Sequence, residues 1–259
     1  MIDPNLSVED DAAIVNPAVN ARTPKLGPVA LIVSPKKDLN HCRDLMQWPT
    51  DGYRPLYLSR LYYSKNNSSG ISLAGPVIGA PYAAMMLESL IAWGSRQIIF
   101  LGWCGSIDPH VRTGDIIIPD EAIIDEGTSR HYLGEDIRAV KPSAKLARVL
   151  HKTFTDRGID THKGPVWTTD AVFQETKTKV RHHQRLGVLG VEMELSALFS
   201  VGRYRFVDVA GVLVVSDELS TLEWQPGFKS PDFEKGRATA LEGLLACCRG
   251  LIGHVKNGF

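Results

Sequence analysis

The chain has 259 residues, a length that a single hydrophobic core can serve. Hydrophobic residues make up 44% and charged residues 22%, an ordinary globular profile that excludes extensive disorder and fibrous repeats. Lysine plus arginine equals aspartate plus glutamate, at 29 each, and no apolar run reaches the roughly 18 residues of a membrane span, so we expect neither a nucleic-acid nor a membrane partner.

The four cysteines form no CxxC pair, which favours a reducing cytoplasm over an oxidising compartment. The first residues are acidic and polar, the reverse of a secretory signal. Residues 1–25 contain Pro4, Pro17 and Pro24 and predict a loose N-terminal arm or a wrapping extension. We therefore expect a cytoplasmic protein with one domain over residues 26–259.

Apolar segments of strand length alternate with segments of helical periodicity. Strands are predicted at residues 29–33, 56–63, 71–73, 98–101, 114–119, 166–170, 188–192 and 207–215. Helices are predicted at residues 82–93, 142–157, 175–186, 195–204 and 232–250, and turns at residues 34–38 and 64–70. This order predicts a single α/β domain with a mostly parallel, twisted central sheet flanked by helices.

Polar or glycine-containing segments follow four of the predicted strands, at residues 34–38, 102–106, 192–194 and 216–217. In an open α/β sheet, ligands bind at the carboxyl ends of the strands. We therefore expect these four segments to line one site.

Glu192 and Glu194 are the most informative pair among these residues. In an extended backbone, residues i and i+2 face the same way, and a helix that begins near Glu194 favours its ionised form. Paired carboxylates of this kind can bind the hydroxyl groups of a sugar, and the alternative is a solvated pair at an ordinary strand–helix junction. No metal site is predicted, because the eight histidines are scattered.

Four motifs of the sequence carry a resemblance to a known family. They are Gly-Pro-Val-Ile-Gly-Ala-Pro at 75–81, Gly-Trp-Cys-Gly-Ser-Ile at 102–107 with Gly-Asp-Ile-Ile-Ile-Pro at 114–119, Val-Glu-Met-Glu at 191–194, and Val-Ser-Asp at 215–217. With them the chain resembles the nucleoside phosphorylase family, which includes purine nucleoside phosphorylase, uridine phosphorylase and methylthioadenosine nucleosidase. The resemblance implies a nucleoside phosphorylase-like fold and a pentosyltransferase that cleaves the N-glycosidic bond of a nucleoside. It also implies a homo-oligomer (dimer, trimer or hexamer), no cofactor, and inorganic phosphate as a co-substrate.

The resemblance assigns the binding of the sugar and the protonation of the leaving base to two short segments. Met193 and Glu194 match the family's ribose binders, with the Glu194 carboxylate on the 2′ and 3′ hydroxyls, and Glu192 matches the flanking acid. Asp217 matches the acid that protonates a purine near N7, and such a general acid typically contributes about 10²–10⁴-fold. Uridine-specific relatives lack this acid, so the resemblance favours purines. Glu194 and Asp217 are thus the candidate catalytic residues, and a turn or cap acid is the alternative for Asp217.

The resemblance places the wall that stacks on the base between Trp167 and Phe173. Phe173 is the first candidate and Trp167 the second, with a core position as the alternative for either. His131 falls in a region that can approach the site, and a surface histidine is the ordinary alternative.

The phosphate-binding positions depart from the family's pattern. Relatives carry a Gly-Asp-Pro-x-Arg-like turn where this chain has Ser-Pro-Lys-Lys at 34–37, and Phe100 and Trp103 replace an arginine and a serine or threonine. Burying phosphate without paired cations is costly. The candidates for a rebuilt anion site are Gly102, Trp103, Lys36, Lys37 and Arg60.

Three functions therefore stay open. Phosphorolysis, which the resemblance implies, would use the rebuilt anion site. Hydrolysis follows if Phe100 and Trp103 close the phosphate pocket, with Glu192 as the one candidate base for the attacking water. A non-catalytic nucleoside-binding protein would tolerate the lost phosphate ligands, although the presence of Asp217 argues against it.

Overall fold

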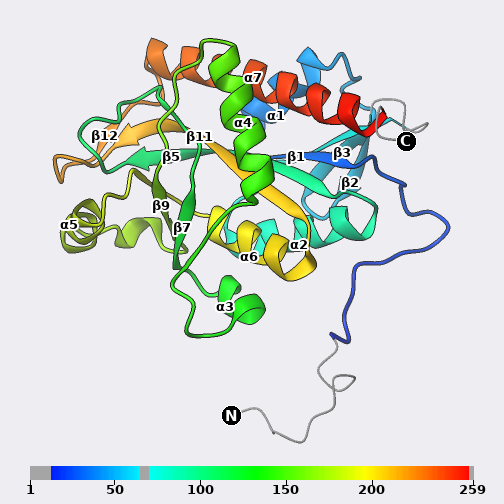
Figure 1. The fold of residues 1–259 in the computed structure, drawn as a ribbon, viewed down its shortest axis with the longest axis horizontal. Coiled ribbons are helices and arrows are strands. Elements are labelled where there is room, and N and C mark those ends of the chain that lie inside the picture. The colour runs from blue at the N-terminus through cyan, green and yellow to red at the C-terminus, as the bar shows by residue number, and fades with distance from the viewer. Residues whose placement is uncertain (1–12, 65–69, 257–259) are drawn as a thin grey trace, which may run out of the picture.

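The computed structural model describes residues 13–64 and 70–256, in which one mixed sheet is covered on both faces by helices (Figure 1). The strands are β1 (Val29–Val33), β2 (Tyr53–Leu56), β3 (Ser59–Tyr63), β4 (Ile71–Gly75), β5 (Gln97–Ser106), β6 (Ile116–Ile117), β7 (Glu121–Asp125), β8 (Ala139–Val140), β9 (Pro165–Thr169), β10 (Gly190–Glu192), β11 (Asp208–Glu218) and β12 (Gln225–Pro226). The helices are α1 (Lys36–Leu45), α2 (Ala80–Ala92), α3 (Thr128–Leu133), α4 (Ala144–Asp156), α5 (Lys177–Arg185), α6 (Leu195–Arg205) and α7 (Pro231–Lys256), with a 3-10 turn η1 (Val172–Gln174). The predicted α/β fold is confirmed.

The main path of the sheet runs in the order β2-β3-β4-β1-β5-β10-β9-β7-β8, and β11 pairs with β5, β6 and β12. The pairings of β1 with β4 and β5, of β5 with β11, and of β9 with β7 and β10 are parallel. Along one edge, residues 97–101 of β5 pair with β1, whereas residues 105–106 pair with β10 in the antiparallel direction. This change of partner leaves residues 102–104 of β5 without a neighbouring strand on that edge.

Both faces of the sheet are buried. Along β1, Ala30 and Ile32 belong to the core that includes residues of α2 and α6, while Val29, Leu31 and Val33 belong to the core that includes residues of α1, α4 and α7. Figure 1 shows α1, α4 and α7 on one side of the sheet and α2, α3 and α6 on the other. Continuous apolar strands are expected where helices cover both faces.

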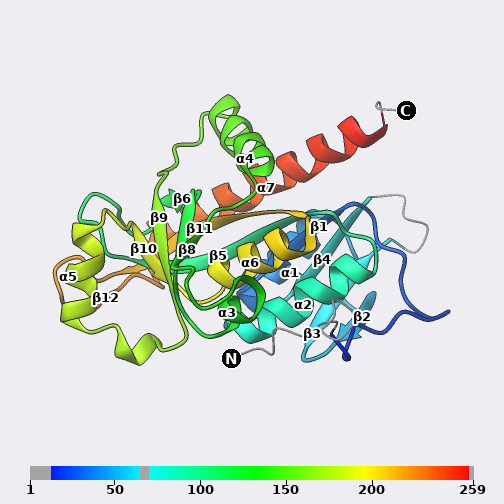
Figure 2. The same ribbon diagram turned by 60° about the horizontal axis from the view of Figure 1, so that its bottom comes forward.

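The two ends of the sheet differ. In Figure 2, α5 and β12 lie beside β9 and β10 at one end, and β2 and β3 lie at the other. A small third core that includes Trp167, Val180 and Val191 packs α5 against β9 and β10. The polar ends of β10 and β11 lie at this same end of the sheet, near α5 and β12.

The predicted turn at residues 34–38 is wrong, because helix α1 begins at Lys36. Pro35 occupies the N-cap position, and Asp38, Leu39 and Cys42 are buried. One of the buried residues is an acid, so the segment lacks the apolar periodicity from which a helix is predicted.

Other element boundaries also differ from the prediction. The strand predicted at 56–63 is a hairpin of β2 and β3, with Tyr57 at φ 54° in its turn. Strands β5 and β11 run past their predicted ends, to Ser106 and Glu218. Elements α3, β7, β8 and β12 lie in segments for which none was predicted. The turn predicted between residues 64 and 70 falls mostly outside the described residues.

Residues 1–12 of the predicted arm lie outside the described residues, and residues 13–25 contact the domain. The Trp93 indole N–H donates to the Ala18 carbonyl at 3.0 Å, and Arg54 donates to the Arg22 carbonyl at 2.6 Å. Over residues 13–64 and 70–256, no helix is both long and apolar enough to cross a membrane.

Candidate functional site

A cavity of about 920 Å³ opens beside the part of β5 that has no neighbouring strand on one edge. Ser34, Trp103, Glu192 and Asp217, one from each of the four polar segments expected to converge, line this cavity. The structure thus brings together segments that lie far apart along the chain, at the place that the arrangement of strands in an α/β sheet predicts for a ligand.

Glu192, the last residue of β10, binds the start of helix α6. Its Oε2 accepts the backbone N–H groups of Glu194 and Leu195 at 2.7 and 2.8 Å, and the Thr168 hydroxyl donates to Oε1. The carboxylate therefore satisfies free N–H groups at a helix N-terminus, where negative charge is favoured. These bonds fix the backbone that carries Met193 and Glu194 into the cavity.

Glu194 is 4% exposed and lines the cavity. Its Oε1 accepts the Gly79 N–H at 2.6 Å. Gly79 has φ 81°, a conformation that favours glycine, and it immediately precedes helix α2. The motif at residues 75–81 therefore contributes a backbone donor that positions Glu194.

The two buried glutamates affect each other's ionisation. Burial raises the pKa of Glu194, and the nearby charge of Glu192 raises it further. Burial also raises the pKa of Glu192, while the hydrogen bonds from Thr168 and from the backbone lower it. Because Glu192 accepts three hydrogen bonds, we assign the first negative charge of this pair to Glu192 and the retained proton to Glu194.

Asp217 lies near the end of β11, opposite Gly105 of β5. The Ser216 hydroxyl donates to Oδ1 at 2.6 Å, and the Trp224 indole N–H donates to Oδ2 at 2.9 Å. A Cβ on Gly105 would lie 3.1 Å from Asp217 Oδ2 and 2.5 Å from a Leu219 methyl group, so a glycine is needed for this close approach. The carboxyl group is therefore held in one orientation at the cavity wall.

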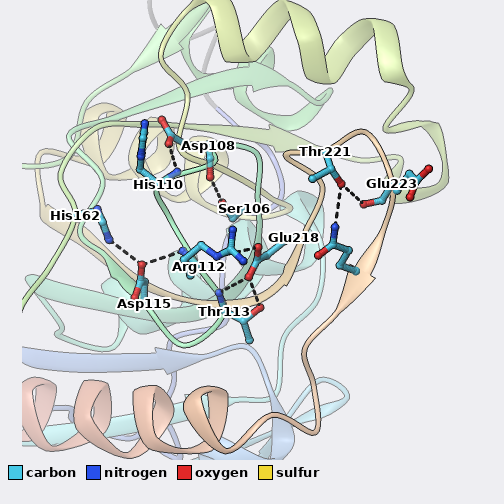
Figure 3. A network of polar contacts seen from close by, with 11 residues as sticks. Ser106, Asp108, His110, Arg112, Thr113, Asp115, His162, Glu218, Thr221 and Glu223 are labelled. Atoms are coloured by element: carbon cyan, nitrogen blue, oxygen red, sulfur yellow. Dashed lines mark hydrogen bonds and ion pairs between the residues drawn. The ribbon is translucent and has the colours of Figure 1, made fainter.

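The residue after Asp217 anchors the end of β11 to the loop before β6 (Figure 3). Glu218 Oε1 accepts the Thr113 N–H at 2.9 Å and the Thr113 hydroxyl at 3.0 Å, and Arg112 Nε lies 3.4 Å from Oε2. Successive side chains of a strand face opposite sides. Binding Glu218 on the loop side therefore directs Asp217 to the cavity side.

The two candidates for the base-stacking wall have different positions. Phe173 lies in η1, lines the cavity and is 96% exposed. Trp167 is fully buried in β9, stacks on His183 at 4.3 Å between ring centroids, and donates its indole N–H to Asp125 at 3.0 Å. Trp167 is therefore a core residue of this chain and does not line the cavity.

Trp103 lines the cavity and is held from behind by a buried ion pair. Its indole N–H donates to Asp38 Oδ2 at 2.6 Å, and Arg237 Nε donates to Asp38 Oδ1 at 2.8 Å. Asp38 is fully buried and Arg237 is 3% exposed, with the guanidinium 5.2 Å from the Trp103 ring centroid. The positive charge of Arg237 is thus taken up by Asp38.

The other candidates for a rebuilt anion site lie away from the cavity lining. Lys36 is exposed at the start of α1, and Lys37 pairs with Glu234. Arg60 lies over the Tyr53 ring at 4.7 Å, and Gly102 lies opposite Leu213 in the β5–β11 pairing. Phe100, expected to close a phosphate pocket with Trp103, is fully buried in the core, and His131 is exposed on α3. Among the predicted anion-site residues, the cavity lining includes Trp103 alone.

Several residues at the site received no role from the sequence: Asp38, Glu175, Trp224, Phe228 and Arg237. Trp224 and Phe228 are large aromatic residues in a segment with proline, glycine and serine, which is a usable signal of a binding loop. Asp38 and Arg237 are separated by 199 residues, so no local pattern connects them.

Comparison with known proteins shows the family to which the chain belongs. The Phosphorylase superfamily matches residues 47–251. The DeoD-type purine nucleoside phosphorylase of Clostridium novyi (strain NT) is 30% identical over 155 residues, which are 59% of this chain and 66% of the relative. The DeoD-type enzyme of Caldanaerobacter subterraneus subsp. tengcongensis is 31% identical over the same shares. The matched stretch thus spans slightly less than two thirds of the length of these relatives.

Solved structures show the same fold over nearly the whole chain. The purine nucleoside phosphorylase of Toxoplasma gondii, solved in complex with immucillin-H, has a TM-score of 0.76 at 20% identity and covers 93% of this chain and 97% of its own. The uridine phosphorylase of Vibrio fischeri ES114 has a TM-score of 0.71 at 22% identity and covers 88% of this chain and 93% of its own. Since the family match covers most of the chain, this protein belongs to the Phosphorylase superfamily.

Proposed function

We propose that this protein cleaves the N-glycosidic bond of a purine nucleoside and that water is the acceptor. The observation that carries the proposal is one cavity that joins the Met193–Glu194 segment with Asp217 and that the described residues line with acids and no cation. The distant likeness to purine nucleoside phosphorylases supports a nucleoside as the substrate.

Asp217 and Glu194 act at the two ends of the bond that breaks. Asp217 protonates the purine near N7, so that the base leaves as a neutral molecule when its bond to the sugar C1′ breaks. Water forms the new bond at C1′ and releases one proton to the solvent, and Asp217 takes up one proton from the solvent before the next turnover. Glu194 binds the ribose 2′ and 3′ hydroxyls, which need acceptor oxygens. Negative charge on the Glu192–Glu194 pair also favours the positive charge that develops on the sugar. Glu192 supports the backbone of this segment, since it already accepts three hydrogen bonds.

The charges in the cavity favour water over phosphate. Of the described residues that line it, four are acids (Glu175, Glu192, Glu194 and Asp217) and none is a lysine, arginine or histidine. Two like charges about 4 Å apart repel by about 4 kcal/mol at an effective dielectric constant of about 20. Millimolar affinity for phosphate amounts to only about 4 kcal/mol, so one uncompensated carboxylate nearby offsets it.

Trp103 and Asp38 add a second obstacle to phosphate. The Trp103 ring lies at the position where the family resemblance implies a serine or threonine, and its indole N–H, which already donates to the buried Asp38 carboxylate, is not available to phosphate. Arg237 does not relieve this, because its guanidinium is bound to Asp38 and Glu234. A neutral water molecule meets neither obstacle.

The proposal is tested by base release from a panel of purine and pyrimidine nucleosides, in phosphate-free buffer and with added millimolar phosphate. We expect purine nucleosides to be cleaved in phosphate-free buffer, with a rate that phosphate does not increase. Chromatography of the free base gives the rate.

Two results would contradict the proposal in different ways. Base release that requires phosphate would make the protein a phosphorylase. Binding of nucleosides by calorimetry without any base release would instead support a non-catalytic nucleoside-binding protein.

A further inference from the structure

The carboxyl group of Glu126 is buried outside the cavity lining, and the reaction proposed above gives it no role. Glu126 directly follows β7 and is 4% exposed. It accepts the backbone N–H groups of Thr128 and Ser129 at 2.5 and 3.1 Å, and these bonds fix the start of α3. It also accepts the Ser196 hydroxyl at 2.9 Å. This last bond reaches a different helix, α6, which the fixing of α3 does not require.

Ser196 connects Glu126 to the backbone that carries Glu194 into the cavity. Ser196 is fully buried in the first turn of α6. Its backbone N–H donates to Thr168 Oγ1 at 3.0 Å, and the Thr168 hydroxyl donates to Glu192. Glu192 in turn accepts the backbone N–H of Glu194 at 2.7 Å. A row of hydrogen-bonded residues therefore runs from Glu126 to the residue proposed to bind the ribose.

The start of α3 also contacts a second wall of the cavity. The Gly127 N–H donates to Asp170 Oδ2 at 3.0 Å, and Asp170 shortly precedes η1, from which Phe173 lines the cavity. Figure 2 shows α3 beside α6. The contact with Asp170 does not involve Ser196. A substitution of Ser196 therefore breaks the connection to α6 and leaves the connection to η1 in place.

Helix α6 contains a second buried serine that lacks the connection to Glu126. Ser200 is fully buried and follows Ser196 by about one helical turn. Among the described residues, its hydroxyl has no hydrogen-bond partner. The two serines thus share their residue type, helix and burial, and they differ in their bonding. Ser200→Ala removes a buried hydroxyl without breaking a hydrogen bond, so it is a matched control for Ser196→Ala.

We propose that Glu126 is a positioning residue for the sugar, an inference that rests on the function proposed above. Glu126 holds the Ser196 hydroxyl and with it the first turn of α6. Glu194 at the N-cap of that helix is thereby kept where it can accept the ribose 2′ and 3′ hydroxyls. Hydrogen bonds to a carboxylate are strong and directional, and a displacement of about 1 Å at a reacting group can lower a rate by about 10²-fold.

The test compares kcat/KM for adenosine and for 2′,3′-dideoxyadenosine, which lacks both hydroxyls that Glu194 is proposed to bind. In Ser196→Ala, kcat/KM for adenosine should fall about tenfold, because the first turn of α6 is no longer held. The value for dideoxyadenosine should stay within about twofold of the wild type, since this substrate makes no bond to Glu194. Ser200→Ala should leave both values unchanged. A purely structural role of Ser196 would lower both values equally.

Glu126→Gln is the second variant. The amide nitrogen cannot accept an N–H or O–H group, so the carboxylate's bonds are only partly replaced. We expect the ratio of the kcat/KM values for adenosine and dideoxyadenosine to fall as in Ser196→Ala. Because the two residues act through one contact, the double variant should lower this ratio no further than the larger single effect. Single effects that multiply in the double variant would overturn the inference.

The remaining outcomes separate this inference from the proposed function. A ratio that Ser196→Ala leaves unchanged, or that Ser200→Ala lowers equally, would overturn the inference and leave the proposed function standing. If no nucleoside is cleaved, the proposed function fails, and calorimetric binding of the two nucleosides tests the inference alone. Ser196→Ala should then weaken the binding of adenosine about tenfold and that of dideoxyadenosine by less than about twofold, and equal weakening would overturn the inference.

Discussion

Asp217→Asn is expected to lower kcat for a purine nucleoside by about 10²–10⁴-fold, the usual contribution of a general acid. The amide keeps the shape of the carboxyl group and can still accept the Trp224 N–H, which donates to Asp217 at 2.9 Å. It cannot transfer a proton to the base. We therefore expect substrate affinity and the free energy of unfolding to change little while turnover is lost.

The measurement is steady-state base release together with calorimetric binding of the nucleoside. Asp156→Asn is the matched control, because this exposed acid on α4 pairs with Lys152 and lies outside the cavity lining. Its kcat should equal that of the wild type. Unchanged turnover in Asp217→Asn would remove the acid role from this residue.

Glu194→Gln is expected to lower kcat/KM by about 10–100-fold, since the amide offers the ribose hydroxyls one acceptor oxygen, whereas the carboxyl group can give up its proton and offer two. The same substitution should stabilise the fold at alkaline pH. The pKa of Glu194 is raised above its ordinary value of 4.5 in the folded protein by burial and by Glu192. The folded state therefore holds a proton that the unfolded state releases.

The sign of the pH dependence follows from this difference. Below a pH of about 4.5 both states are protonated and the wild type carries no penalty. As the pH rises from there toward the raised folded pKa, the wild type loses stability, and the neutral glutamine does not. We expect Glu194→Gln to be more stable than the wild type by on the order of 2 kcal/mol at about pH 8 and by much less at about pH 5.

Chemical denaturation at the two pH values measures this effect. Glu135→Gln, a substitution of an exposed acid next to Arg130 and outside the cavity lining, is the matched control and should show no such difference between them. Equal stability of Glu194→Gln and wild type at both pH values would mean that the buried Glu194 is not held at a raised pKa. A buried acid that lowers stability is typical of a binding site rather than of a structural core.

The centre of the sheet could be predicted because its strands are short, continuous apolar segments. Strands β1 and β11 are buried over nearly their whole length, so burial on both faces gives an unambiguous pattern. The polar residues at the ends of β10 and β11 could be predicted as well, because they come directly after apolar segments of this kind. Their meeting in one cavity follows from the architecture of an α/β sheet.

The features that could not be predicted depend on contacts between distant parts of the chain. Asp38 is buried in α1 because Arg237 on α7 neutralises it, and nothing near Asp38 in the sequence shows that partner. The same holds for Glu175, which the fold brings to the cavity that Asp217 also lines from another element. Local periodicity gives neither of these pairs.

Phe173 and Trp167 illustrate a third limit. Both are aromatic residues of one short segment, and composition alone does not separate a wall of the cavity from a core residue. The difference comes from the fold, because β9 is paired on both edges and packed against α5, whereas η1 lies at the surface. Only the position of each backbone segment decides which ring can contact a base.

The most direct test of the central claim is the identity of the sugar product. Adenosine is incubated with the protein in excess inorganic phosphate, and the products are identified by ¹H and ³¹P nuclear magnetic resonance. The acids that line the cavity and the Trp103–Asp38 contact predict free ribose and an unchanged phosphate signal. Accumulation of ribose 1-phosphate in place of ribose would contradict the account, because it would require a phosphate site in a cavity that the described chain lines with acids and no cation.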